Sequence, residues 1–227
     1  MPFPDLPARL QDVRDRIDAA VQRGGHGQAV TIVAVTKTHG PDAVQAAWEA
    51  GLRDVGENRV QEALPKMDAA PVPVRWHLIG HLQRNKVKAL AKFTLLQSLD
   101  SSRLADAVHD YAVASGQSVD ALMQVNVAGE TTKGGFEHAD WQAESERLRG
   151  LAGIRIRGVM TMAPLDADDR TLRSVFAGGR EARDLLRAAG HDAPELSMGM
   201  SNDYEVAAEE GATFVRVGTI LFGARSA

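Results

Sequence analysis

The segment TIVAVTKTHGPDAVQAAWEAG, residues 31–51, contains the pattern from which the fold can be inferred. Its first five residues form a short apolar run of the kind found in buried strands, and a Thr-Lys-Thr sequence follows directly. Pro41 then begins an amphipathic stretch that carries Val44 and Trp48 and ends at Gly51, which is the usual arrangement of Pro and Gly around a helix. The segment predicts one strand–helix unit with polar residues at the carboxyl end of its strand.

This order of elements recurs along the chain. After the strand at 31–35, we expect strands near 53–56, 74–80, 94–99, 119–127, 154–160, 194–198 and 213–218. After the helix that begins at Pro41, we expect helices near 58–68, 83–91, 101–115, 137–149, 169–189 and 203–210. An additional amphipathic helix over 6–21 precedes them. Alternating strands and helices indicate a parallel sheet, and eight units predict a single α/β domain, a TIM-type (β/α)8 barrel over 1–227 with an extra N-terminal helix. The alternative is an open, doubly wound sheet.

Composition excludes several classes of function. The chain has 227 residues and a net charge of −4, so nothing indicates a nucleic-acid-binding protein. It has no cysteine, which excludes disulfides and thiolate chemistry, and its histidines lack the spacing of a metal-binding motif. The N-terminus lacks the apolar run of a signal peptide, and no stretch is long and apolar enough for a membrane span. We therefore expect a cytoplasmic protein without a metal site.

Lys37 is the most informative of the polar residues at the strand ends. It directly follows the first apolar strand, and in a barrel the chemistry takes place at the carboxyl ends of the strands. Partial desolvation there favours the neutral amine, which an amine needs in order to form a Schiff base with an aldehyde. The alternative interpretation is a surface lysine that happens to follow a strand. Lys133, in a glycine-rich loop, is a second and more solvated candidate.

An anion site is predicted at the last two strands. Ser201, Gly218 and Thr219 follow strands seven and eight, where barrels often bind a phosphate group. Arg216 stands between two valines, so its side chain is expected to face the barrel mouth if those valines pack outward. A buried guanidinium needs an acceptor, which is either a ligand or a neighbouring carboxylate.

Two further polar residues, Asn58 and His81, follow the second and third strands, where each could orient a ligand or simply stabilise a turn. Arg155 and Arg157 lie early in strand six, at the opposite end of the barrel, and are expected to be structural.

Taken together, these segments resemble one family over nearly the whole chain. The motifs that carry the resemblance are AVTKT (34–38), GENRVQE (56–62), WHLIGHLQRNK (76–86), RGVMTM (157–162), MGMSNDYEVAAEEGATFVRVG (198–218) and LFG (221–223), together with the loop that leads to Lys133 and Gly134. They are similar to the pyridoxal phosphate homeostasis proteins, which bind pyridoxal 5′-phosphate (PLP). Thr36 stands where many members have serine, and both residues carry a hydroxyl.

The resemblance implies a fold like the barrel domain of alanine racemase and a Schiff base between PLP and Lys37. It implies that Ser201, Gly218 and Thr219 bind the phosphate and that Arg216 lies near the cofactor, at either the ring nitrogen or the phosphate. It also places Asn58 and His81 at the mouth of the site.

The function implied is that of a carrier in PLP homeostasis, which affects amino-acid and keto-acid balance and has little or no catalysis of its own. PLP-dependent enzymes are the expected recipients, and a monomer is expected because the second domain of the racemases is absent. One alternative is an amino-acid racemase, which needs an acid/base group on each face of the substrate. Neither Tyr111 nor Tyr204 is an obvious candidate for that role. A second alternative is an aldolase that uses Lys37 without PLP.

Overall fold

The strands pair in the order in which they occur in the sequence, and the last strand pairs with the first. The computed structural model describes residues 2–130 and 134–223. Its eight strands are all parallel and form a closed barrel, which β1 and β8 complete along the register from Thr31 opposite Phe214 to Ala34 opposite Val217. The predicted (β/α)8 barrel is therefore confirmed, and the alternative of an open sheet is wrong.

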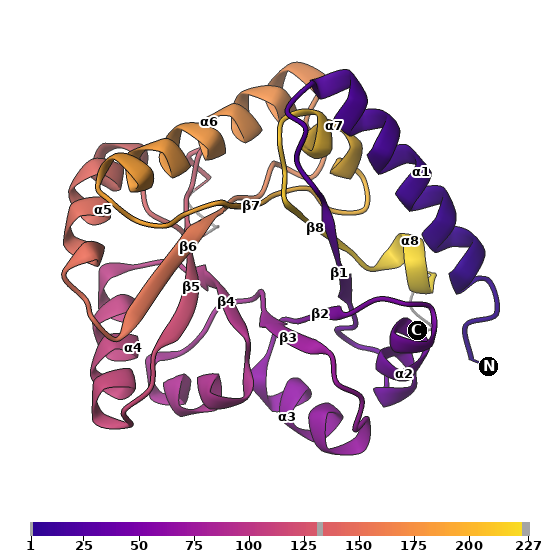
Figure 1. Cartoon of the computed structure of the whole chain (residues 1–227), viewed down its shortest axis with the longest axis horizontal. Helices are drawn as coiled ribbons and strands as arrows, with labels where there is room; N and C mark the ends of the chain where they lie inside the picture. Colours follow the sequence, from indigo (N-terminus) through magenta and orange to yellow (C-terminus); the bar gives the residue numbers. More distant parts are fainter. Residues whose placement is uncertain (1, 131–133, 224–227) are drawn as a thin grey trace.

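Strands form the inner ring of the molecule and helices surround it (Figure 1). The strands are β1 (Thr31–Val35), β2 (Asp54–Glu57), β3 (Arg75–Leu78), β4 (Leu95–Leu99), β5 (Val119–Gln124), β6 (Ile154–Met160), β7 (Glu195–Ser197) and β8 (Phe214–Val217). The α-helices are α1 (Leu6–Gly24), α2 (Pro41–Glu49), α3 (Val60–Ala69), α4 (Ser102–Ala114), α5 (Trp141–Arg149), α6 (Asp169–Ala188), α7 (Tyr204–Glu209) and α8 (Thr219–Phe222). Two 3-10 helices, η1 (Arg84–Lys92) and η2 (His138–Asp140), complete the described elements.

Local sequence signals explain where several helices begin. Pro41 occupies the first turn of α2, where its missing N–H costs no hydrogen bond. Ser101 caps α4 by accepting a hydrogen bond from the backbone N–H of Leu104, and Asp168 caps α6 by accepting one from the N–H of Thr171.

The extra N-terminal helix α1 buries Leu6, Leu10, Val13, Ile17 and Ala20. It packs on α7 and α8 at the closing edge of the barrel.

Two expectations about the helices were inaccurate. The helix expected near 83–91 is the 3-10 helix η1, in which Leu90 alone is buried, so no apolar stripe of α-helical period stabilises an α-helix there. The short helix α8 was not foreseen. Its four residues give too short a pattern for periodicity to detect.

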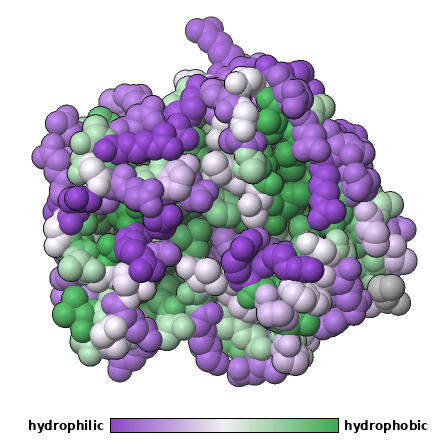
Figure 2. All heavy atoms as spheres, in the orientation of Figure 1, coloured by the Kyte–Doolittle hydropathy of each residue, from purple (hydrophilic) through white to green (hydrophobic). Residues whose placement is uncertain are grey.

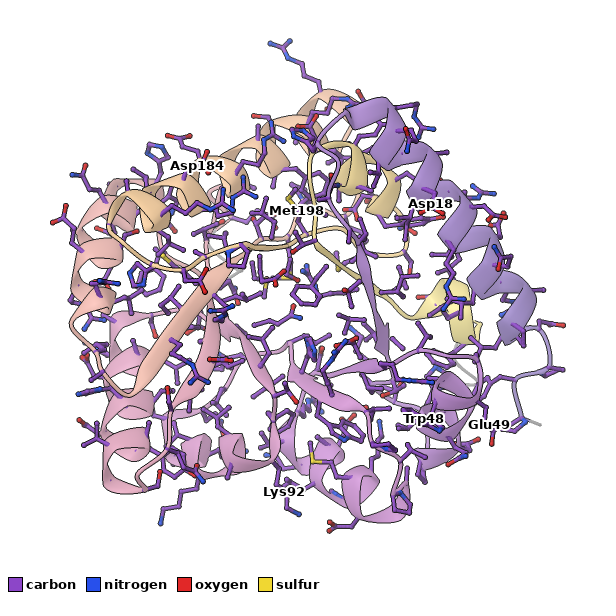
Figure 3. All side chains as sticks on the ribbon, viewed as in Figure 1. Asp18, Trp48, Glu49, Lys92, Asp184 and Met198 are labelled. Atoms are coloured by element: carbon purple, nitrogen blue, oxygen red, sulfur yellow. The ribbon has the colours of Figure 1, made fainter. Side chains whose placement is uncertain are left out.

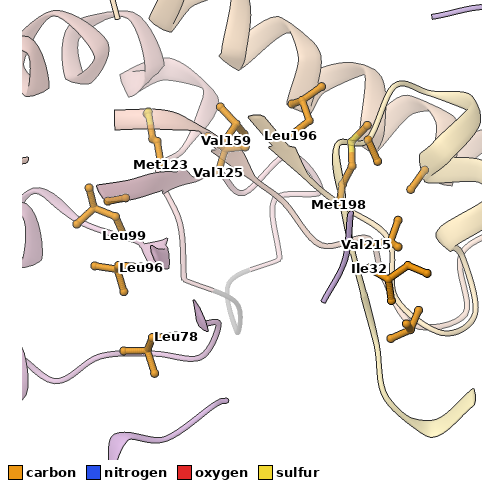
Figure 4. Packing of buried hydrophobic residues seen from close by; sticks show 14 of the residues in the cluster. Ile32, Leu78, Leu96, Leu99, Met123, Val125, Val159, Leu196, Met198 and Val215 are labelled. Carbon is orange, nitrogen blue, oxygen red and sulfur yellow. The ribbon is translucent and has the colours of Figure 1, made fainter. Parts of the chain in front are cut away.

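The main core lies between the barrel and its helices. Outward-facing side chains of the strands, among them Ile32, Leu96, Val159 and Val215, pack there in one continuous apolar cluster (Figure 4). A smaller apolar cluster lies inside the barrel and consists of Leu95, Leu122, Met160, Met162 and Phe214. Figure 3 shows Met198 on the inner side of the helix layer.

The outer surface is mainly polar. Asp18, Trp48, Glu49, Lys92 and Asp184 lie on the outer elements in Figure 3. Figure 2 shows polar residues over most of the same face, with apolar residues visible between them. Arg155 and Arg157 pair with Asp120 and Asp192, each at 2.6 Å, which agrees with the structural role expected of them. Among the helices of the described residues, none is long and apolar enough to cross a membrane.

Candidate ligand site

The carboxyl ends of the strands surround a cavity of about 710 Å³. Its volume is in the range of small-molecule sites. The described lining residues are Val35, Lys37, Thr38, His39, Asn58, Ile79, Gly80, His81, Asp100, Gln124, Gly134, Met162, Leu165, Met200, Ser201, Asn202, Asp203, Arg216, Gly218, Thr219 and Gly223. Every residue that the sequence analysis named as cofactor-binding is among them, although these residues come from widely separated parts of the chain.

Lys37 is held in a constrained turn at the end of β1. On one side of it, the backbone N–H of Thr36 donates to the carbonyl of Gly56 on β2. On the other side, Thr38 has a φ of 68°, a left-handed conformation that is unfavourable for a β-branched residue. From this turn, Lys37 lines the cavity.

A buried ion pair supports the same turn, and sequence reasoning missed it. Lys66 on α3 pairs with Glu57 at the end of β2, and both also hydrogen-bond to Thr36. A signal was present, because Lys66 follows Val60 and Ala63 at intervals of three on the buried face of the helix. A lysine at such a position needs a buried anionic partner.

Arg216 faces the cavity as predicted, because Val215 and Val217 pack outward in the main core. Its guanidinium donates from Nη1 to the hydroxyl of Ser197 at 2.6 Å and from Nη2 to the carbonyl of Thr161 at 2.9 Å. Both of these acceptors are neutral groups. Burial lowers the pKa of Arg216 to about 10, while the negative charge of Asp203 acts to raise it. The guanidinium therefore remains a cation at neutral pH.

Ser201, Gly218 and Thr219 meet on one side of the cavity. The N–H of Gly218 donates to the hydroxyl of Ser201 at 3.4 Å, which joins the segments after β7 and β8. A Cβ at Gly218 would lie 3.0 Å from the carbonyl oxygen of Val35, so glycine allows this backbone to approach β1 closely. Hydroxyl and N–H donors on a closely packed backbone are suited to an anion.

Asn58 and His81 also line the cavity, after β2 and β3. Nδ1 of His81 is 2.7 Å from a carboxylate oxygen of Asp100, and the hydroxyl of Ser101 donates to the other oxygen. The His81 side chain is 70% exposed whereas that of Asp100 is 8% exposed, so the carboxylate orients a histidine that stays accessible. Sequence reasoning did not name Asp100 as a site residue.

Several other candidates lie outside this arrangement. Lys133, the second candidate lysine, is outside the described residues. Neither Tyr111 nor Tyr204 lines the cavity, because Tyr111 bonds to Gln117 on the surface and Tyr204 is buried at the start of α7. Residues 2–130 and 134–223 contain no group of three or more side chains that could bind a metal ion.

The class of protein is defined by a parallel barrel with a lysine after its first strand and with hydroxyl and N–H donors after its last two strands. Residues 9–226 match the family model for the alanine racemase N-terminal domain. Solved alanine racemases share the fold: that of Corynebacterium glutamicum has a TM-score of 0.71 and 16% identity, over 93% of this chain and 61% of the enzyme. At this identity the likeness concerns the fold alone.

Closer relatives identify the family within this class. The pyridoxal phosphate homeostasis protein of Aquifex aeolicus is 42% identical over 96% of this chain and 97% of its own length. The homeostasis protein of Pseudomonas aeruginosa is 40% identical over 97% of this chain and 96% of its own length. The structure of PipY from Synechococcus elongatus with PLP bound has a TM-score of 0.85 and 37% identity, over 96% of this chain and all of PipY. The chain therefore belongs to the pyridoxal phosphate homeostasis protein family.

Proposed function

We propose that this protein binds PLP in the cavity at the carboxyl ends of its strands and acts as a PLP carrier or buffer. The observation that carries the proposal is the convergence of Lys37, Arg216 and the Ser201–Gly218–Thr219 segment on one cavity. The PLP-bound structure of PipY, with its closely similar fold, supports the choice of ligand. We propose the whole chain, 1–227, as a single binding domain.

The residues present fit this ligand chemically. PLP supplies an aldehyde, which condenses with the primary amine of a lysine, and a phosphate dianion. Nζ of Lys37 is the amine that we assign to the aldehyde. We assign Ser201, Gly218 and Thr219 to the phosphate, because they offer hydroxyl and backbone N–H donors. Arg216 can only donate, so it stabilises whichever acceptor atom of the ligand faces it.

We assign Asn58 and His81 to the mouth, where their polar groups orient the ligand and the mouth remains open to solvent. Asp100 fixes the orientation of the His81 ring. An open mouth suits a protein that must both receive and release its ligand. PLP-dependent enzymes are the proposed recipients, and we propose that the carrier acts as a monomer.

The experiment is borohydride reduction of the PLP-loaded protein, followed by peptide mass mapping. Reduction fixes a Schiff base to its lysine, so we expect a pyridoxyl adduct on Lys37 and its loss in the Lys37→Ala variant. Lys66 is an internal control, because its buried ammonium is paired with Glu57 and should stay unmodified. Adducts restricted to other lysines would refute the assigned site. No adduct and no yellow colour would favour the aldolase alternative.

The His81–Asp100 pair is the observation that favours an enzyme, since a histidine oriented by a carboxylate is a common acid/base arrangement. Racemisation would need a second such group on the other face of the substrate. We propose weak or no catalysis. The protein loaded with PLP should turn over alanine far more slowly than roughly 1 per second, and a rate at or above that value would contradict the carrier role.

A further inference from the structure

A line of buried polar side chains crosses the inside of the barrel. Nη1 of Arg216 donates to the hydroxyl of Ser197 at 2.6 Å, and that hydroxyl donates to Oε1 of Gln97 at 2.6 Å. Nε2 of Gln97 lies 2.8 Å from Nδ1 of His77, whose Nε2 lies 3.0 Å from Oδ1 of Asp54. All five residues are at most 4% exposed. We call these five residues the polar chain.

The two ends of the polar chain reach different parts of the molecule. Arg216 lines the ligand cavity at the carboxyl ends of the strands. Asp54 is the first residue of β2 and lines a separate crevice of about 230 Å³ together with Arg75. Arg75 donates two hydrogen bonds to the Asp54 carboxylate, at 2.6 and 2.7 Å. The polar chain thus connects the cavity with the opposite end of the barrel.

Hydrogen-bond chemistry at the Arg216 end fixes the direction of the chain. A guanidinium can only donate, so the Ser197 oxygen accepts from it. The hydrogen of the same hydroxyl is donated to Gln97 at 2.6 Å. The Gln97 atom that faces Ser197 must therefore be the carbonyl oxygen. Its NH₂ group then faces Nδ1 of His77, which must accept through a lone pair.

The Asp54 end requires the same direction. Burial raises the pKa of the Asp54 carboxyl, but hydrogen bonds from His77 and Arg75 outweigh burial and hold the pKa below its ordinary value. The group is thus an ionised acceptor, and Nε2 of His77 must carry the hydrogen. Two charged residues lie near the His77 ring: Asp54 of β2, which is in direct contact with it, and Arg75 of β3, which is bonded to Asp54. The uncharged ring of Phe214 on β8 packs against it.

We infer that His77, Gln97 and Ser197 are positioning residues for Arg216, and that the polar chain operates with His77 as the neutral tautomer protonated on Nε2. Inward barrel positions are normally filled by branched apolar side chains. A buried polar line is costly unless every member is satisfied, and here every link pairs one donor with one acceptor. The result is a guanidinium with a fixed orientation at the cavity, which limits the rotation available to the long Arg216 side chain before a ligand arrives. The inference rests on the proposed function for the identity of that ligand.

The first test needs no ligand. Nitrogen-15 NMR of the histidine rings in the PLP-free protein distinguishes the two neutral tautomers and the imidazolium. We expect the His77 ring, assigned by loss of its signals in His77→Gln, to be protonated on Nε2 alone at pH 7. A hydrogen on Nδ1 would overturn the inference. In Gln97→Glu, the new carboxylate accepts on both sides, so we expect His77 to gain a hydrogen on Nδ1 as well. If residue 97 only filled space, this substitution would leave the protonation of the His77 ring unchanged.

The second test measures PLP binding. Gln97→Met keeps the volume of the side chain but removes both hydrogen-bonding groups, and Ser197→Ala removes the link to Arg216. Each should weaken PLP binding roughly tenfold and shift the absorption band of bound PLP. Ser197→Thr retains the hydroxyl, so it should bind PLP with the affinity and the absorption band of the unmodified protein. Arg155→Gln is the matched control, because it breaks a surface ion pair at the opposite end of the barrel and should leave PLP binding unchanged.

The outcomes separate this inference from the proposed function. If the unmodified protein fails to bind PLP, the proposed function fails, while the tautomer of His77 still tests the direction of the chain. If the unmodified protein binds PLP, and the folded Gln97→Met and Ser197→Ala variants bind it as tightly with the same absorption, the positioning role fails on its own. Circular dichroism of each variant establishes that it is folded.

Discussion

Nζ of Lys66 lies 2.6 Å from Oε1 of Glu57, at the junction of α3 and the end of β2. The same carboxylate oxygen accepts a hydrogen bond from the hydroxyl of Thr36, and Nζ of Lys66 also donates to the carbonyl of Thr36. The Glu57 side chain is fully buried, and that of Lys66 is 10% exposed. The ion pair therefore holds the hydroxyl and the carbonyl of Thr36, the residue that precedes Lys37.

Removing one member of this pair should destabilise the protein strongly. Lys66→Met leaves the Glu57 carboxylate buried without its cation, which costs about 3–5 kcal/mol in comparable pairs. The double variant Lys66→Met/Glu57→Gln removes both charges and should recover most of that loss. Urea unfolding measures the free energy of unfolding of each variant.

The matched control for this prediction is Lys92→Met, because Lys92 pairs with Asp68 on the surface, where both side chains are more than half exposed. Its effect should stay within about 1 kcal/mol. If Lys66→Met and Lys92→Met lowered the free energy of unfolding equally, burial would not increase the contribution of the Lys66–Glu57 pair to stability.

Replacing Thr38 by glycine should weaken ligand binding without lowering the stability of the protein. The φ of 68° at Thr38 is costly for a β-branched residue and free of strain for glycine, so Thr38→Gly should leave the free energy of unfolding unchanged or raise it by up to about 1 kcal/mol. The freed turn should hold Lys37 less firmly and weaken PLP binding. Thr38→Val, which keeps the branched side chain, is the control for loss of the hydroxyl. A drop in stability together with unchanged PLP binding in Thr38→Gly would contradict the prediction.

Periodicity was sufficient to predict most of the barrel, because each strand–helix unit is stabilised by its own apolar pattern. The strands over 31–35 and 154–160 begin and end where the sequence placed them. Strand β5 stops at Gln124, earlier than expected, and Val125 beyond it forms a separate bridge with Phe136. The helix expected near 83–91 lacked an apolar stripe, and a pattern of charged residues cannot distinguish a 3-10 helix from an α-helix.

The site was predictable where a residue's position in the unit determines its direction. Lys37 belongs to this group because it directly follows a strand at the carboxyl end of the barrel, and Arg216 because alternation along its strand turns it toward the barrel mouth. The links between units were not predictable, because Gln97 and Ser197 are a hundred positions apart in sequence and only barrel closure joins them. The pairing of His81 with Asp100 depended in the same way on the meeting of the ends of β3 and β4.

Glu209 should make stability depend on pH in the acid range. It accepts hydrogen bonds from Arg23 of α1 and Arg173 of α6, at 2.6 and 2.7 Å, and so joins both helices to α7. Burial raises the pKa of Glu209, but the hydrogen bonds from Arg173 and Arg23 outweigh it and hold the pKa below its ordinary value of 4.5. A carboxyl with a lowered pKa in the folded state stabilises the protein above its unfolded-state pKa and loses that contribution as pH falls through the folded-state value.

Glu209→Gln tests this dependence. At pH 7 the variant should be less stable by about 1 kcal/mol, a modest figure because both arginine partners are roughly half exposed. The difference between the variant and the unmodified protein should shrink as the pH falls below 4.5. Thermal unfolding from pH 3 to pH 7 would measure it. A difference that stays constant over this range would mean that packing, rather than charge, accounts for the effect.

Gly80→Ala should disrupt the mouth of the cavity, because a Cβ at this position would lie 2.4 Å from the carbonyl oxygen and 2.8 Å from the Cα of Asn58. These are backbone atoms, which cannot move aside as the end of a flexible side chain can. We expect a loss of about 2–3 kcal/mol in the free energy of unfolding. We also expect weaker PLP binding, since the strain falls between Asn58 and His81.

Gly150→Ala is the matched control for this substitution. Gly150 ends α5 with a φ of −78°, and a Cβ there would approach only the carbonyl of Arg147, at 3.4 Å. Alanine loses less backbone entropy than glycine on folding, so this variant should be neutral or more stable by about 0.5 kcal/mol. Thermal unfolding of the two variants side by side separates a steric effect at Asn58 from the general effect of adding a methyl group. If Gly80→Ala were as stable as Gly150→Ala and bound PLP normally, the close approach of Gly80 to Asn58 at the cavity would not be required for the site.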